Sequence, residues 1–458
     1  DPTGKSMLRR VPEVLDCWFE SGSMPYAQVH YPFENKEWFE SHFPADFIVE
    51  YMSQTRGWFY TMIVLSSAIF DKPPFKNCIC HGVILGEGGQ KLSKRLKNYA
   101  DPQSVFATLG ADAMRWFMLS SSVMRGQEVV IDSEANGAKE AIKSIISPLW
   151  NAYNFFVLYA NIDEIKANFS LSYQIMLNRF IINKAMLASC QVKEYLDNYD
   201  TIGAINVIEE LVEVLNNWYI RRSREYFWSN NKDSKEKKEG YNALYSVLLL
   251  MTKVASPLLP MITEAIYRGL TNNESVHLTE FPHYQKEEID FTIIQDMERV
   301  RDACNAALRI RNDAGIRIRQ PLGKVTFIGV ADNLSDEMKN LILSETNVKE
   351  WENHDSRAIE QFAQRILKLN LPLLAKRLPT KTKDFINASK NGQWSWTKSG
   401  QLLIAEEVLN DDEFFFTLKP KKEIANCTAV LRDSLVMLDL DLDEELLLEG
   451  TARDLIRI

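Results

Sequence analysis

Residues 77–89 read NCICHGVILGEGG. The first nine form an apolar run that is typical of a buried strand, and the three glycines that follow allow a tight turn. Upstream, residues 46–50 (DFIVE) predict a second buried strand, and the apolar stretch 54–70 is long enough for a buried helix between the two. Downstream, Asp101-Pro102 predicts the start of another helix, because proline is favoured at the first helical position. Strand, helix, strand and helix in this order predict a parallel α/β sheet.

Beyond residue 133 the pattern becomes helical. Apolar residues recur at spacings of three and four in 180–196, 202–218 and 241–251. The polar stretch 229–240 between the last two reads SNNKDSKEKKEG, which predicts a solvated loop. We therefore predict a helical bundle over residues 133–288.

The remaining segment, residues 289–458, mixes both kinds of element. One helix is expected over 290–312, and shorter strands are expected at 325–330, 401–405 and 435–442. The fold class is therefore multidomain, with an α/β domain over 1–132, the helical bundle, and a small α+β C-terminal region.

Composition limits the function classes. Of the 458 residues 46% are hydrophobic and 25% are charged, which excludes wholesale disorder. The formal charge of −9 means that an RNA partner would be held by local basic patches. Six scattered cysteines indicate a reducing compartment, and the uncharged run 144–162, interrupted by Pro148, predicts a buried helix and no membrane span. With no signal peptide, we expect a soluble cytoplasmic protein, and the missing initiator Met predicts that the chain is part of a longer one.

The glycine-rich turn leads into a basic segment, GEGGQKLSKRLKN, at residues 86–98. It carries Lys91, Lys94, Arg95 and Lys97 within seven residues, with Ser93 between the first two lysines. Two lysines three residues apart on a loop suit a polyphosphate whose charge moves during a reaction. A solvated basic turn explains the same composition equally well.

Residues 91–95, KLSKR, resemble the KMSKS signature of class I aminoacyl-tRNA synthetases. Residues 16–28 (DCWFESGSMPYAQ) and 50–58 (EYMSQTRGW) resemble the isoleucyl branch of that family more than its valyl and leucyl branches. Further blocks that are similar to the family follow in the same order at residues 110–116, 217–221, 317–322 and 449–453. The resemblance implies that the α/β domain is the second half of a Rossmann-like catalytic domain and that the bundle binds the anticodon.

The resemblance also implies ATP-dependent activation of L-isoleucine to isoleucyl-adenylate, followed by transfer to tRNA(Ile). Catalysis of this kind rests on positioning and charge stabilisation. Lys94 matches the lysine that steadies the leaving pyrophosphate, Lys91 assists it, and Ser93 donates a hydrogen bond. Gly82 and the two lysines are assigned to ATP binding. Mg²⁺ is implied on the phosphates, without a metal site in this sequence, and zinc occurs in some relatives but has no place here.

Four residues match family positions around the aminoacyl-adenylate. Glu50 ends a predicted parallel strand, where such folds bind ligands, and Gln54 is expected to open the next helix and to face the same ligand. Trp18 and Trp58 match the walls of the isoleucine side-chain pocket, although unmatched tryptophans more often lie in a core. Where the family often has glycine and an acid, this chain has Tyr51 and Ser53, which predicts altered contacts to the adenylate and to inhibitors that mimic it.

Basic residues after an aromatic pair suggest the RNA contact. The candidates are Trp218, Arg221, Arg222 and Arg224, and residues 221–240 hold seven cations against four acids. Aromatic rings and arginines suit unstacked bases and phosphates, whereas a solvated helix end with Trp218 in the core is the alternative. A second basic stretch over 299–319 fits RNA contact and solvent exposure equally.

Cys78 and Cys80 share one face of a strand, and burial as small residues is the favoured interpretation.

The HIGH-type motif of the family does not occur in the 458 residues. We therefore expect the chain to be inactive alone, as part of a monomeric isoleucine–tRNA ligase. The alternatives are a valine-type ligase and a non-catalytic tRNA-binding module.

Overall fold

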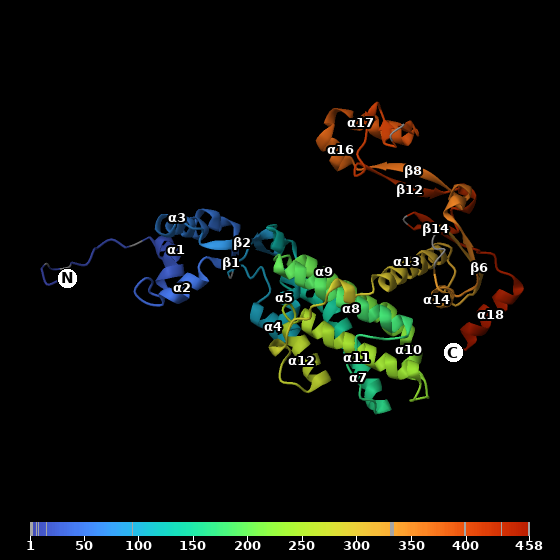
Figure 1. Ribbon diagram of the computed structural model, residues 1–458, viewed down its shortest axis with the longest axis horizontal. Helices are drawn as coiled ribbons and strands as arrows, with labels where there is room; N and C mark the ends of the chain where they lie inside the picture. The colour runs from blue at the N-terminus through green and yellow to red at the C-terminus, as the bar shows by residue number, and fades with distance from the viewer. Residues whose placement is uncertain are drawn as a thin grey trace. The chain divides into compact units, whose positions relative to one another are not determined.

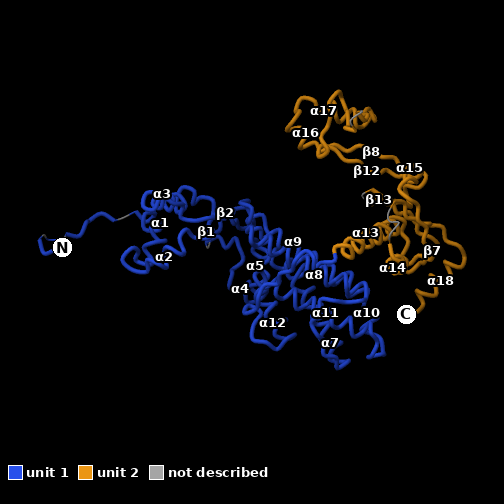
Figure 2. The backbone as a smooth tube through the Cα atoms, in the orientation of Figure 1, with its two compact units in different colours: residues 1–290 blue, residues 291–458 orange. Residues whose placement is uncertain are grey.

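The computed structural model describes residues 3–5, 7, 9–14, 16–93, 95–329, 334–397, 400–431 and 433–456. The chain divides into two compact units, residues 1–290 and 291–458, which Figure 2 shows in different colours. The boundary expected near residue 132 falls inside the first unit and stays a prediction.

The first unit begins with a small α/β arrangement (Figure 1). Strands β1 (Ala45–Tyr51) and β2 (Phe75–His81) pair in parallel, with Glu50 beside Cys80. Helix α3 (Trp58–Phe70) connects them and packs on α1 (Cys17–Ala27). Ile48 of β1 forms a small core with Phe59 and Met62 of α3. The predicted strand–helix–strand order is confirmed.

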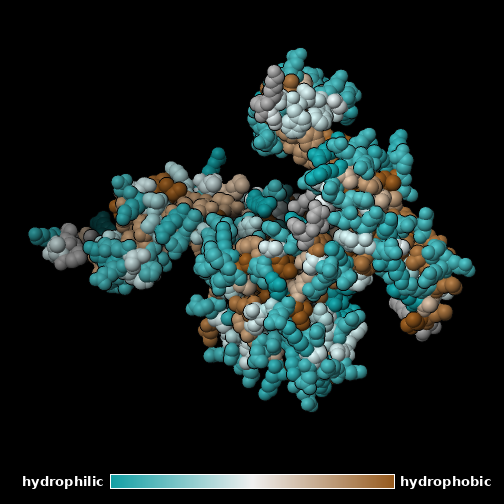
Figure 3. Space-filling view, turned by 45° about the vertical axis from the view of Figure 1, so that its right-hand side comes forward, coloured by the Kyte–Doolittle hydropathy of each residue, from teal (hydrophilic) through white to brown (hydrophobic). Residues whose placement is uncertain are grey.

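The two strands are less buried than the sequence predicts. Ile48 faces α3, whereas Phe47 and Val49 on the opposite face are 48% and 45% exposed. Apolar side chains of α3, such as Ile63 and Ile69, are also exposed, and Figure 3 shows hydrophobic colouring on parts of the molecular surface. The prediction of two buried strands is wrong because the helices of the described chain cover one face of the pair only.

The single strand predicted over 77–85 is broken. After β2 the chain turns, and β3 (Ile84–Gly86) joins a different sheet, between β4 (Gln90–Lys91) and β5 (Val129–Val130). The break lies at Gly82, whose N–H donates to the Val123 carbonyl over 2.7 Å. A Cβ at Gly82 would lie 1.7 Å from the Gln127 carbonyl oxygen, so only glycine allows this approach.

The helix predicted over 54–70 also begins later than expected. Residues Met52–Arg56 form a 3₁₀ turn, η1, and α3 starts at Trp58 after Gly57. Gln54 therefore lies before the helix and does not open it. Helix α4 (Pro102–Leu109) begins as predicted, since the Asp101 side chain accepts from the Ser104 N–H and Pro102 occupies the first turn.

Helices form the rest of the first unit. The longest are α7 (Ser147–Asp163), α8 (Met176–Asp197), α9 (Thr201–Glu213), α11 (Lys235–Ala255) and α12 (Pro260–Thr271). Helix α9 continues through a π-helical segment, η5 (Val214–Ile220), into α10 (Arg221–Trp228). The predicted bundle is confirmed. Among the helices of the described residues none is long and apolar enough to cross a membrane.

The solvated loop predicted over 229–240 is wrong beyond Ser234. Ser234 caps α11, because its side chain accepts from the Lys237 N–H, and the helix starts at Lys235. Lys237 is 2% exposed, and its Nζ lies 2.6 Å from Asp163 of α7. The sequence shows Lys237 within a run of charges, but the carboxylate that pairs with Lys237 lies more than seventy residues upstream.

The second unit opens with α13 (Phe291–Asp313), close to the predicted helix. A four-stranded sheet has the order β13-β14-β6-β7, and only β6 and β7 are parallel. Its strands are β6 (Leu322–Ile328), β7 (Val348–His354), β13 (Thr428–Leu431) and β14 (Ser434–Leu438). The strand predicted over 435–442 therefore ends at Leu438, and Val330 of the strand predicted over 325–330 lies outside the described residues.

An antiparallel ribbon extends from this sheet region. It pairs β8 (Ala363–Leu369) with β12 (Phe414–Pro420), next to α16 (Leu371–Arg377) and α17 (Thr382–Lys390). A three-stranded sheet of β9 (Trp394–Trp396), β10 (Leu402–Ile404) and β11 (Glu407–Val408) lies beside them, and Leu367, Phe385 and Leu402 share one core. Helices α14 (Asp336–Thr346) and α18 (Glu444–Leu455) complete the α+β region.

Candidate functional site

Three of the predicted adenylate residues meet around Gly57. A Cβ at Gly57 would lie 2.7 Å from Gln54 Oε1 and 3.1 Å from the Trp18 ring. Gln54 Oε1 accepts from the Trp58 N–H over 2.9 Å, and Trp58 Nε1 donates to the Ser21 carbonyl of α1 over 3.0 Å. The 3₁₀ turn, the glycine and the start of α3 thus bring Trp18, Gln54 and Trp58 together.

Glu50 lies on the strand that leads to this cluster. It is exposed at the C-terminal end of β1, and its Oε2 accepts from the Tyr51 N–H over 3.2 Å. The Tyr51 ring stands 6.2 Å from the His81 ring of the neighbouring strand. A carboxylate at the open end of a parallel strand pair is suited to receive a cationic ligand group.

The two tryptophans differ in their relation to a nearby pocket. Trp58 forms part of an apolar pocket of about 250 Å³ between α1, α2 (Lys36–His42) and β1. Ile48, Met62 and Phe39 also line this pocket, whereas Trp18 packs on Gly57 and is 41% exposed. A cavity of this size, walled by aliphatic and aromatic groups, suits a small apolar side chain.

The basic loop is a closed turn held by Asn98. Asn98 Oδ1 accepts from the Ser93 N–H over 2.9 Å, and its Nδ2 donates to the Lys91 carbonyl over 3.1 Å. The Asn98 backbone carbonyl accepts a hydrogen bond from the Glu87 N–H over 2.6 Å. A Cβ on Gly86 would lie only 2.4 Å from this carbonyl oxygen. Sequence reasoning missed Asn98, although an amide at the end of a basic glycine-rich loop is a signal for such closure.

The predicted phosphate-binding residues have different positions in this turn. Lys91 is exposed at the end of β4, and Ser93 Oγ accepts from the Leu96 N–H over 3.3 Å. Lys94 lies outside the described residues. Gly82 lies in the turn between β2 and β3, with the Gln127 backbone packed where a side chain would be. The assignment of Gly82 to ATP binding stays a prediction.

On the bundle, α10 carries the predicted RNA residues. Arg221 and Arg224 are exposed, Arg222 is half-buried, and the Arg224 guanidinium lies 5.9 Å from the centre of the Trp228 ring. Trp228 is 56% exposed, and its Nε1 donates to the Tyr159 hydroxyl over 2.8 Å.

Trp218, by contrast, is 4% exposed in the bundle core, and the described residues offer its Nε1 no hydrogen-bond partner. A buried ring cannot stack on bases, so Trp218 is not part of the surface that could contact RNA. The exposed ring is Trp228, which the sequence analysis missed, although its spacing of four residues from Arg224 places both on one helix face.

The second basic stretch is partly structural. Arg311 of α13 is 2% exposed and donates to the carbonyls of Arg317, Gln320 and Asn347 over 3.3, 2.9 and 2.8 Å. Burial lowers the pKa of its guanidinium to about 10. Gln320 in turn donates to the Leu446 carbonyl of α18 over 2.7 Å, so the blocks at 317–322 and 449–453 belong to one packed region.

The cysteine pair is more open than predicted. Cys78 is exposed and Cys80 is half-buried, with their Sγ atoms 3.9 Å apart, so the prediction that both are buried is wrong for Cys78. Partial desolvation and the hydrogen bond to Cys80 raise the pKa of the Cys78 thiol to about 11. In the described part of the chain no three His, Cys, Asp or Glu side chains gather in a way that could hold a metal ion.

Two protein families match different parts of the chain. The family described as "tRNA synthetases class I (I, L, M and V)" matches residues 2–130, and "Anticodon-binding domain of tRNA ligase" matches residues 178–326. Isoleucine–tRNA ligases of Rickettsia bellii and Rickettsia prowazekii are each 48% identical over the whole chain. The chain spans 43% and 44% of the length of these two relatives.

A solved structure supports the fold. A ternary complex of an Agrobacterium radiobacter LeuRS with tRNA and LeuAMS has a TM-score of 0.50 at 16% identity, covering 73% of this chain and 38% of the other. Its fold is shared, with catalytic-type and anticodon-binding parts that the family matches assign to residues 2–130 and 178–326. The chain therefore belongs to the class I tRNA synthetase family, in its isoleucine–tRNA ligase branch.

Proposed function

We propose that this chain is the pyrophosphate-facing and anticodon-binding part of a ligase that activates L-isoleucine with ATP and transfers it to tRNA(Ile). One observation carries the proposal: Trp18, Gln54 and Trp58 meet beside strand β1, which carries Glu50 near its end, in a chain that is 48% identical to isoleucine–tRNA ligases over all its residues. An apolar wall next to an exposed carboxylate suits a substrate that has an aliphatic side chain and an ammonium group.

Each group has a defined task in the proposed reaction. Glu50 receives the ammonium of isoleucine, and the pocket beside Trp58 takes its side chain. Lys91, Ser93 and Lys94 stabilise the charge that develops on the pyrophosphate as the α-phosphate is attacked. Asn98 positions Lys91 and Ser93 by closing the turn. Mg²⁺ enters with the ATP phosphates, since no described cluster of three ligands would hold it.

The first test concerns activation. The 458 residues contain no HIGH-type motif, so we expect no isoleucine-dependent ATP–pyrophosphate exchange by this chain alone. A chimera that adds the preceding part of the Rickettsia bellii relative is expected to exchange with isoleucine. In that chimera Glu50→Gln is expected to lower kcat/KM for isoleucine by about tenfold to a hundredfold, because a hydrogen bond to a charged group is lost.

The controls separate the alternatives. Glu37→Gln removes an exposed carboxylate of α2 outside the cluster and is expected to leave exchange unchanged. Faster exchange with valine than with isoleucine would support the valine-type ligase. A chimera that binds tRNA but exchanges with neither amino acid would support the non-catalytic binding module.

The second test concerns RNA. The chain is titrated with tRNA(Ile) and tRNA(Val) transcripts at several salt concentrations. We expect preferential, salt-sensitive binding of tRNA(Ile), weakened severalfold by Arg221→Ala and by Arg224→Ala, whereas Lys36→Ala on α2 is the matched control. Equal binding of the two transcripts, or equal effects of all three substitutions, would contradict the placement of the RNA surface on α10.

We further infer that the whole ligase is a cytoplasmic monomer. Sedimentation of the chimera with and without tRNA tests the monomeric state, since a stable dimer would contradict it.

A further inference from the structure

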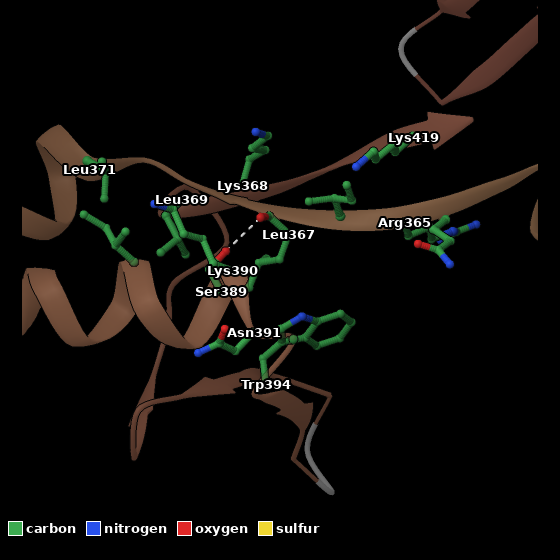
Figure 4. Close-up of a pocket in the computed structure, with 14 residues that line it drawn as sticks. Arg365, Leu367, Lys368, Leu369, Leu371, Ser389, Lys390, Asn391, Trp394 and Lys419 are labelled. Carbon is green, nitrogen blue, oxygen red and sulfur yellow. Dashed lines mark hydrogen bonds between the residues drawn. The ribbon is translucent and has the colours of Figure 1, made fainter. Parts of the chain in front are cut away.

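A pocket of about 670 Å³ lies in the second unit, along strand β8 and the C-terminal end of α17 (Figure 4). Among the described strands, β8 pairs with β12 alone, so its other edge has no strand beside it there. Ser389 of α17 donates from its Oγ to the Leu367 carbonyl of β8 over 2.9 Å and fixes the helix end beside the strand. Figure 4 shows the Trp394 ring below the strand, with Asn391 on one side and Arg365 on the other.

The charged side chains that line this pocket are all positive. They are Arg365, Lys368, Lys390 and Lys419, and no carboxylate of the described chain lines it. This contrasts with the net charge of −9 of the whole chain. Two acidic residues of the same region are engaged by other cations, since Glu407 pairs with Lys381 over 2.6 Å and Glu413 pairs with Arg377 over 2.5 Å, whereas Asp433 shares a smaller pocket with Arg365.

The strand register distributes these cations around the pocket. Leu418 lies opposite Arg365, whereas Phe415 lies opposite Lys368 and Lys419 opposite Gln364. Because neighbours along a strand point to opposite faces, Arg365 shares the face of the core residue Leu367, while Lys368 lies on the other face. The open edge of β8 therefore has cations on both sides, which suits an anion that lies along the edge.

An aromatic ring completes the lining. Trp394 is half-buried, with its ring centre 5.2 Å from that of Phe416 of β12. Part of the indole therefore packs on the ribbon while part faces the pocket. An indole held in this way presents a fixed surface for a planar group.

We propose that this pocket binds a nucleotide unit, with the phosphate among the cations of β8 and α17 and the base against Trp394. Phosphate and base together account for both the cations and the ring, whereas a carboxylate ligand would use the cations alone. The unit belongs either to a free nucleotide or to a single RNA strand that crosses the pocket. The proposal goes beyond the function proposed above, since no step of amino-acid activation involves these residues.

The test uses the full chain and two probes: adenosine monophosphate by calorimetry, and a short fluorescein-labelled single-stranded RNA of mixed sequence by anisotropy. Lys390→Glu is expected to weaken binding of the RNA about tenfold at low salt and to reduce the slope of log K against log salt by about 0.7 or more. Lys383→Glu makes the same charge change at an exposed position of α17 outside the pocket, and it is the matched control.

The aromatic contact is tested separately. Trp394→Leu is expected to weaken binding about fivefold or more, whereas Trp394→Phe keeps most of the affinity, because stacking on a ring contributes substantially per base. Circular dichroism spectra show whether each variant is folded, and the exposed Lys390→Glu substitution keeps the test decisive if Trp394→Leu is not folded.

The outcomes identify the source of the nucleotide. Binding of both probes with loss in Lys390→Glu assigns the site to free nucleotides, and binding of the RNA alone with the same loss assigns it to a strand. No binding of either probe, or equal effects of Lys390→Glu and Lys383→Glu, overturns the proposal. The result is independent of pyrophosphate exchange in the chimera and of Arg221→Ala, which test the proposed function on the first unit.

Discussion

At the scale of single residues, the buried pair of Lys237 and Asp163 has the largest predicted effect on stability. Lys237 is 2% exposed, Asp163 is 9% exposed, and Tyr241 donates its hydroxyl proton to Asp163 over 2.6 Å. Lys237→Met would leave the Asp163 charge buried without its cation, so we expect the free energy of unfolding to fall by about 3 kcal/mol or more. Urea denaturation of the chain measures this loss.

A second substitution controls for packing. Asp163→Asn in the Lys237→Met background removes the unpaired charge and is expected to restore more than half of the loss. A double variant as unstable as Lys237→Met would show that the lysine contributes through packing and not through the ion pair.

The same pair predicts a pH dependence. Burial alone would raise the pKa of Asp163, but hydrogen bonds from Lys237 and Tyr241, together with attraction to Lys237, lower it below the ordinary 3.8. The unfolded chain therefore binds the proton more readily, and the contribution of Asp163 to stability is present above about pH 4 and is lost as the pH falls through the folded pKa. Unfolding curves of the wild-type chain and of Asp163→Asn should converge at low pH, and a constant difference would contradict the shift.

Cys78 is expected to react slowly for an exposed thiol. Because its pKa is raised to about 11, only a small fraction is thiolate at neutral pH. Its alkylation by iodoacetamide, followed by mass spectrometry, should accelerate about tenfold for each pH unit between 7 and 10. Cys80→Ser removes the neighbouring thiol and should increase the rate at pH 8, and an unchanged rate would exclude that neighbour as a cause.

At the scale of elements, glycines and caps decide where strands and helices end. Gly82 breaks the run predicted as one strand, and Ser234 starts α11 inside a run of charges predicted as loop. Both signals are visible in the sequence, but each depends on a partner that is distant from it, the Gln127 backbone for Gly82 and Asp163 for the helix that Ser234 caps. Local pattern therefore identified the elements and missed these ends.

The basic loop depends on one amide. Asn98→Ala removes the acceptor for the Ser93 N–H and the donor to the Lys91 carbonyl, so the turn loses two of its closing hydrogen bonds. We expect trypsin to cleave within residues 91–97 severalfold faster than in the wild-type chain, as measured by mass spectrometry under native conditions. Asn98→Asp keeps the acceptor, so its rate of cleavage should lie between those of the wild-type chain and Asn98→Ala. Equal cleavage rates of all three chains would contradict the role of Asn98.

At the scale of the whole molecule, each of the two compact units has its own core. Arg311 holds three carbonyls within the second unit, and Lys237 holds α7 and α11 within the first. We expect Arg311→Met to lower the stability of residues 291–458 by about 2–3 kcal/mol, because buried carbonyls lose their donor. Hydrogen exchange read by mass spectrometry should then increase in the core of the second unit and stay unchanged in that of the first.

The reciprocal variant is the control. Lys237→Met should increase exchange in the bundle and leave the sheet formed by β6, β7, β13 and β14 unchanged. Exchange that increases in both units with either substitution would show that they unfold as one cooperative body.

The sequence by itself determined the order of the main elements and the helical bundle, because periodicity and motifs are local properties. The ordered blocks around Trp18, Glu50 and KLSKR carried the family resemblance that the comparisons then showed. Only the tertiary structure decided which of these side chains are accessible. It placed Trp218 in the core and Trp228 on the surface. It also paired Lys237 with Asp163 and placed Gly82 in a turn. The physical reason is that burial and charge pairing depend on partners tens of residues away, which no local pattern contains.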